Sequence, residues 1–73
     1  MKNEFDAYAR VQQLAEERNM TISCLAKTCG LNPSTITSGI RRGGIMRLDT
    51  IMMICDGLDM TIIEFFTPPN ESV

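Results

Sequence analysis

The basic side chains of this 73-residue chain gather in one segment, residues 21–47. The segment contains no Asp or Glu, and it holds four of the seven Lys and Arg residues: Lys27, Arg41, Arg42 and Arg47. The segment carries a net charge of +4, and the segments before and after it carry −1 and −5, so the whole chain carries −2. Contacts to phosphate act within a screening length of about 8 Å, so an acidic chain can still present a basic binding face. On charge alone, a solvated surface explains the segment equally well.

Residue types that support catalysis or metal binding are sparse. The chain has no His, which excludes His-based acid–base catalysis, and Cys24, Cys29 and Cys55 form no CxxC or other metal-like spacing. We also find no nucleophile–base pair and no phosphate-binding loop. We therefore expect no enzyme activity, no metal, no cofactor and no small-molecule ligand. The cysteines are interpreted as small buried hydrophobic residues.

Length and composition favour one small folded domain, residues 1–67, followed by a C-terminal tail, residues 68–73. No apolar run approaches the roughly 18 residues of a membrane span, and the first residues lack a signal peptide. We expect a cytoplasmic protein that makes no membrane contact. A domain of this size has marginal stability, which makes a homodimer attractive.

Apolar spacing predicts an all-α fold of five short helices. The first helix is expected from a cap at Asn3 to about Asn19, with Arg10 on its solvated face. Thr21 is expected to cap a second helix that ends at about Cys29, before Gly30.

The dipeptide Asn32-Pro33 is a strong start signal for the third helix, because it combines a capping residue with proline at the first helical position. This helix is expected to run from Pro33 to Ile40 or Arg41, with Ile36 and Ile40 facing inward. Gly39 within it indicates either close packing or fraying.

A loop is expected to lead to a fourth helix over residues 48–58. Its predicted inward arc comprises Leu48, Ile51, Met52, Ile54, Cys55 and Leu58, with Met53 pointing the opposite way. Thr61 and Glu64 have the spacing of a capping box and predict a short fifth helix, which Pro68 and Pro69 would end.

The ordered segments LAKTCGLNPSTITSGIRRG and LDTIMMICDGLDMTIIEFF, within residues 11–66, resemble the Cro and phage-repressor type of helix-turn-helix regulators, the Xre family. The resemblance implies a lambda-repressor-like DNA-binding domain with its helix-turn-helix motif at about residues 21–41. It implies a sequence-specific regulator of transcription that binds double-stranded DNA as a homodimer. The recognition helix, about residues 33–40, would lie in the major groove.

On this interpretation, two sets of residues contact DNA. The short side chains on the exposed face of the recognition helix would contact base edges, with modest specificity: Pro33, Ser34, Thr37 and Ser38. The helix starts and the basic residues would contact the backbone: Thr21, Ser23, Lys27, Asn32, Thr35, Arg41, Arg42 and Arg47.

The sequence departs from the family pattern at four positions. Ile22 stands where the family often has a phosphate-binding Gln, and Gly39 replaces a larger residue. Met46 replaces a common Pro, and Arg47 replaces a common Ser or Thr cap.

A protein-interaction module that has kept the fold without strong DNA binding, such as an antitoxin-like protein, is the alternative, and the acidic last third of the chain favours it. An exposed patch of Met53 with Ile63, Phe65 and Phe66 is one candidate for the dimer contact.

Overall fold

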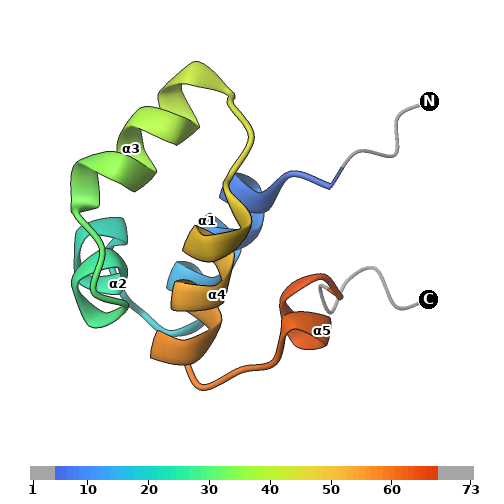
Figure 1. Cartoon of the computed structure of the whole chain (residues 1–73). Helices are drawn as coiled ribbons and strands as arrows, with labels where there is room; N and C mark the ends of the chain where they lie inside the picture. Colours follow the sequence, from blue (N-terminus) through green and yellow to red (C-terminus); the bar gives the residue numbers. More distant parts are fainter. Residues whose placement is uncertain (1–4, 68–73) are drawn as a thin grey trace.

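The computed structural model describes residues 5–67, and within this range the chain forms five helices and no strand. The helices are α1 (Ala7–Glu17), α2 (Ile22–Thr28), α3 (Pro33–Arg42), α4 (Leu48–Gly57) and α5 (Ile62–Phe65). Figure 1 shows α2 and α3 together at one side of α1 and α4, and α5 at the far side. The predicted all-α fold is confirmed. The predicted cap Asn3, the prolines Pro68 and Pro69, and the tail lie outside the described residues.

Local side-chain caps fix the starts of three helices, as predicted. Thr21 Oγ1 accepts a hydrogen bond from Cys24 N at 3.0 Å, and Asn32 Oδ1 accepts one from Ser34 N at 3.0 Å. Thr61 and Glu64 form the reciprocal capping box, with bonds of 3.0 and 2.8 Å. Each cap satisfies backbone N–H groups that have no partner within the helix.

The first and third helices differ from their predicted bounds. Asp6 Oδ1 accepts from Ala9 N at 3.1 Å and caps α1, so α1 begins at Ala7 and the prediction of an earlier start is wrong for Phe5 and Asp6. The Phe5 ring instead packs on Phe66, with centroids 4.8 Å apart. Helix α3 continues through Arg42, beyond the predicted end, because the chain leaves the helix only at Gly43, which has a φ of 70°.

The core lies where the inner sides of α1 to α4 meet α5. Its largest fully buried side chains are Phe65, Leu14, Leu25, Ile36, Ile54 and Val11. The predicted inward arc of α4 is confirmed for Ile51, Ile54, Cys55 and Leu58 but wrong for Leu48 and Met52, which are 63% and 55% exposed. The neighbouring elements cover a narrower stripe of α4 than its apolar pattern spans. Met46, from the loop before α4, is buried and belongs to the core.

Two glycines allow close contacts between helices. A Cβ at Gly39 would overlap the ring of Tyr8, so α3 packs tightly on α1 there. Of the two reasons predicted for a glycine at this position, close packing is the one observed. A Cβ at Gly57 would lie 2.7 Å from the Cα of Cys29, which brings the end of α4 against the end of α2. These contacts set how α2 and α3 sit on the rest of the domain.

Arg10 corrects the prediction of a wholly solvated polar face on α1. Its side chain is 5% exposed. Its Nε donates to Phe65 O at 2.6 Å and its Nη2 to Glu64 O at 2.9 Å, while its Nη1 donates to Gln13 Oε1 at 2.7 Å. The guanidinium thus pairs with carbonyls at the end of α5, where positive charge is favoured, and ties α5 to α1.

Candidate nucleic-acid interface

Helices α2 and α3 pack against each other around a tight turn. Gly30 adopts a φ of 76°, which suits glycine. The bonds Gly30 N to Lys27 O (3.1 Å) and Leu31 N to Ala26 O (2.8 Å) close the end of α2. Leu25, Ala26 and Ile36 are fully buried and hold the pair on the core. This arrangement turns the opposite face of α3 toward solvent.

The outward face of α3 carries the four residues predicted to contact base edges. Ser34 and Thr37 are exposed, whereas Pro33 and Ser38 are half-buried. Ile36 is buried, as predicted, and Ile40 is half-buried. Residues three and four apart on a helix are neighbours. Ser34, Ser38 and Arg41 therefore follow one stripe along α3, which leads from short polar side chains to a cation.

The hydroxyl groups of Ser34 and Thr37 already have acceptors near the start of α3. Ser34 Oγ donates to Asn32 Oδ1 at 2.9 Å. Thr37 Oγ1 lies 3.3 Å from Pro33 O and 3.4 Å from Ser34 O. A hydroxyl has one donor and two acceptor lone pairs. With their protons used internally, both hydroxyls offer lone pairs to solvent and are suited to accept hydrogen bonds from amino groups.

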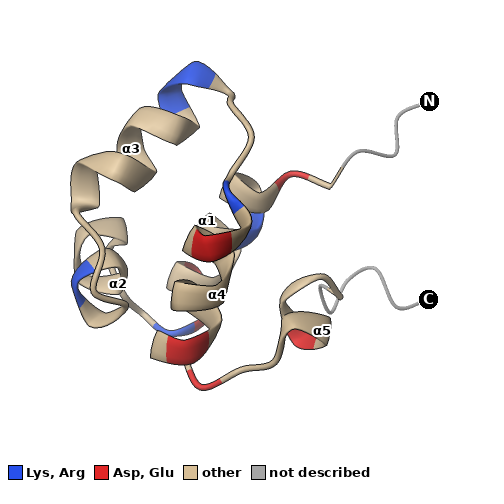
Figure 2. Cartoon of the chain, viewed as in Figure 1, with Lys and Arg blue, Asp and Glu red and all other residues tan. Residues whose placement is uncertain are grey.

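The predicted backbone-contacting cations are all exposed. Lys27 lies on α2, and Arg41 and Arg42 lie in the last turn of α3. Figure 2 shows Lys and Arg on α2 and at the end of α3, while Asp and Glu lie on α4 and α5. Arg47 precedes α4, where its side chain makes no capping bond and instead forms an exposed ion pair with Asp49 at 3.4 Å. Such exposed pairs contribute little, about 0–1 kcal/mol, so Arg47 is easily diverted to another anion.

The remaining predicted contact residues stand at the two helix starts. Thr21, Ser23, Asn32 and Thr35 are all exposed. Thr21 and Asn32 use their side-chain oxygens as caps. The backbone N–H groups of Cys24 and Ser34 therefore already donate within the protein. Ile22, at the position where a phosphate-binding Gln is common, is half-buried and packs against the core.

The three cysteines differ in environment, which corrects the prediction that all are buried. Cys24 is exposed, whereas Cys29 and Cys55 are buried. Burial raises the pKa of the Cys29 thiol, and the neighbouring Cys55 adds to the effect. Burial, followed by the Glu64 carboxylate, raises the pKa of the Cys55 thiol. Both buried groups therefore remain thiols, and the thiolate is the reactive form.

We expect one cysteine per chain, Cys24, to react quickly with iodoacetamide at pH 8. Cys29 and Cys55 should react only as the protein unfolds. Folding raises the pKa of both thiols. The stability that the two protonated thiols contribute is therefore present below about pH 8.5 and is lost as the pH rises through the folded-state pKa. Mass spectrometry of a labelling time course, with and without urea, measures how fast each cysteine reacts. Rapid labelling of Cys29 in the folded protein would contradict the burial described here.

A helix, a tight turn at Gly30 and a second helix with a solvent-facing polar side define a helix-turn-helix protein. The family model for the Cro/C1-type HTH DNA-binding domain matches residues 10–71, and the chain belongs to this family. The resemblance predicted from the sequence is thus confirmed, and DNA is the partner that the family indicates. Comparison with curated proteins and with solved structures gives no match. Among the described helices, none has the length and apolar character needed to cross a membrane.

Proposed function

We propose that this protein is a sequence-specific regulator of transcription that places α3 in the major groove of double-stranded DNA. The observation that supports this most is the division of α3 itself. Ile36 is fully buried on one side, while Ser34 and Thr37 are exposed on the other. A helix that is polar along its outer side fits the groove and can meet base edges.

In this proposal Pro33, Ser34, Thr37 and Ser38 contact base edges. Their side chains are short and cannot form the bidentate pairs worth about 1–3 kcal/mol each, so specificity is modest and relies partly on bridging water. Because Ser34 Oγ donates to Asn32, its outward lone pairs favour partners that donate, namely the amino groups of adenine or cytosine.

The cations and the helix starts contact the phosphate backbone. Lys27, Arg41, Arg42 and Arg47 supply charge, and Thr21, Ser23, Asn32 and Thr35 supply N–H or hydroxyl groups close to the same face. These contacts position α3 and carry no sequence information of their own.

The protein is proposed to act as a cytoplasmic homodimer. Helix-turn-helix dimers bind two half-sites about 34 Å apart, and the described chain extends only 32 × 26 × 22 Å, so one copy spans one half-site. Phe65 is fully buried and is removed from the predicted dimer patch, whereas Met53 and Phe66 remain exposed. Sedimentation with and without duplex DNA tests this, and a 1:1 complex on a two-site duplex would contradict it.

Two substitutions separate the proposed roles. Arg42→Ala should weaken binding to all duplexes alike, because the side chain contacts phosphate. It should also lower the log–log salt slope by about one unit. Ser34→Ala should alter the preferred sequence with little change in salt slope. The Asn32 cap survives this change because it accepts from the Ser34 backbone N–H.

Selection of bound sites from a random duplex pool, repeated with each variant, measures the sequence preference. Binding across a salt series measures the slope. Arg18→Ala is the matched charge control, since Arg18 is exposed near the end of α1 and donates to Leu58 O at 3.3 Å. A changed sequence preference for Arg42→Ala, or none for Ser34→Ala, would contradict these role assignments.

A further inference from the structure

A groove of about 480 Å³ lies between α1 and α5. Leu14, which is buried, and Met60, which is half-buried, form its apolar floor. Ile63 stands at its edge and is 76% exposed. An isoleucine exposed to this degree beside an apolar floor provides an unpartnered contact for another apolar side chain.

The rim of the groove is predominantly acidic. Glu17, Asp59 and Glu64 are exposed on its two sides. Of the two arginines there, Arg10 is buried against α5, and Arg18 directs a bond to Leu58 O. Among residues 5–67 the only ion pair joins Arg47 to Asp49, so the rim carboxylates have no cationic partner within the described chain. The exposed rim thus carries three carboxylates against one cation, Arg18, and its net negative charge favours a positively charged occupant.

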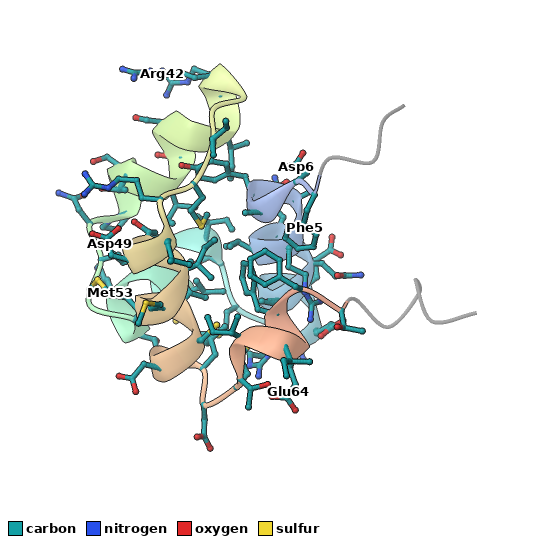
Figure 3. All side chains as sticks on the ribbon, turned by 45° about the vertical axis from the view of Figure 1, so that its right-hand side comes forward. Phe5, Asp6, Arg42, Asp49, Met53 and Glu64 are labelled. Carbon is teal, nitrogen blue, oxygen red and sulfur yellow. The ribbon has the colours of Figure 1, made fainter. Side chains whose placement is uncertain are left out.

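The groove lies away from the DNA-facing side of the molecule. Figure 3 shows Glu64 and Arg42 at opposite ends of the domain, with their side chains pointing away from each other. Helix α5 is likewise at the far side from α3 in Figure 1. An occupant of the groove would leave the basic residues of α2 and α3 free.

We propose that the α1–α5 groove binds a basic amphipathic helix of a partner protein. An apolar side chain of that helix packs on Ile63 and Met60, and flanking Lys or Arg side chains lie beside Glu17, Asp59 and Glu64. Amphipathic helices bind grooves in this way through apolar anchors one turn apart, with complementary charge setting specificity. DNA and the partner then occupy different faces, so the protein connects the two.

Charge distinguishes this occupant from the other candidates. A second copy in a twofold contact would place the same patch on itself, so two rims of net negative charge would face each other. Nucleic acid and anionic lipid carry the same sign as the rim and would be repelled. Only a cationic partner gains from both the apolar floor and the rim.

The probe for this proposal is a synthetic 14-residue helix with Leu on one face and Lys on the other. The full chain, labelled with ¹⁵N, is titrated with this peptide and, separately, with a Leu/Glu peptide of the same pattern. We expect amide shifts confined to the α1–α5 groove with the Leu/Lys peptide only. The titration is made without duplex DNA, because the Lys side chains of the peptide would bind DNA phosphates directly, so failure of DNA binding by the protein would leave the groove result unaffected.

Matched variants locate the contact. Ile63→Lys should weaken peptide binding about tenfold or more, equivalent to about 1.4 kcal/mol, because it removes the anchor and adds like charge. Ile45→Lys makes the same change at a residue 95% exposed in the loop before α4 and should leave binding within about twofold. Glu17→Gln with Asp59→Asn should weaken binding and reduce its salt dependence. Asn suits position 59 because the residue there has a φ of 57°.

Several results would overturn the proposal. These are equal binding of the Leu/Glu peptide, equal losses in Ile45→Lys and Ile63→Lys, or amide shifts spread over α2 and α3. Groove shifts that grow with protein concentration in the absence of peptide would also overturn it, because they would show that a second copy occupies the groove. Absence of any peptide binding at millimolar concentration would do the same.

Discussion

Replacing Arg10 with Met should lower the free energy of unfolding by about 2–4 kcal/mol, a large share of the stability of a domain this small. Met preserves much of the aliphatic volume but removes the donors to Phe65 O and Glu64 O, which lie 2.6 and 2.9 Å away. Removing a donor from a buried carbonyl costs more than the net worth of the bond, because the acceptor stays desolvated. We expect the contact between α5 and α1 to loosen first.

Arg18→Met is the matched control, at the residue that directly follows α1. Arg18 is exposed and makes one bond of 3.3 Å to Leu58 O, so the loss should stay below about 1 kcal/mol. Urea unfolding followed by circular dichroism measures both variants. Similar losses in the two would show that the burial of Arg10 does not stabilise the fold as described.

Gly57→Ala is expected to destabilise the protein despite favouring a helix. The new Cβ would lie 2.7 Å from both the Cα and the Sγ of Cys29. Relieving that overlap moves the backbone of α2 relative to α4, and overpacking of this kind costs about 1–3 kcal/mol. The gain from replacing Gly in a helix is at most about 1 kcal/mol, and less at the last residue of α4. The net effect is a loss of about 1–2 kcal/mol.

Gly44→Ala tests the same exchange where there is room. No atom lies within 4 Å of the corresponding Cβ, and the backbone there is not left-handed. Alanine should therefore be neutral or stabilise by up to about 1 kcal/mol through the unfolded state. Thermal unfolding of the two variants gives the comparison. A Gly57→Ala protein as stable as Gly44→Ala would mean that α2 and α4 are not in the close contact described.

Features set by neighbours in the sequence were predictable from the sequence. Thr21, Asn32 and the Thr61–Glu64 pair cap their helices through bonds that span two or three residues. The Gly30 turn and the burial of Ile36 follow from similarly local patterns. The family could be identified because these signals occur in a fixed order along most of the chain.

Features set by distant parts of the chain could not be predicted in this way. Arg10 occupies a polar position on α1, and nothing near it indicates two carbonyl partners more than fifty residues away. Leu48 and Met52 belong to the apolar arc of α4, but the neighbouring helices do not reach them. The acidic groove likewise exists only because α1 and α5 meet.

The candidate interface shows the same division between local and distant effects. The basic segment and the polar side of α3 could be predicted, because both follow from spacing within residues 27–47. The bond from Ser34 Oγ to Asn32 could not, because it depends on rotamers at the start of α3. In the proposed interface, that bond would determine which hydrogen-bonding group Ser34 presents to a base.

The salt dependence of binding to random-sequence duplex DNA tests the central claim most directly. It should be measured for the wild-type protein and for Arg41→Gln with Arg42→Gln, two exposed residues whose replacement leaves the core intact. We predict a log–log slope of several units for the wild type and a slope lower by about two for the double variant, since each phosphate contact contributes about 0.9. Equal slopes, or no binding by the wild type at about 50 mM salt, would contradict the proposed DNA interface.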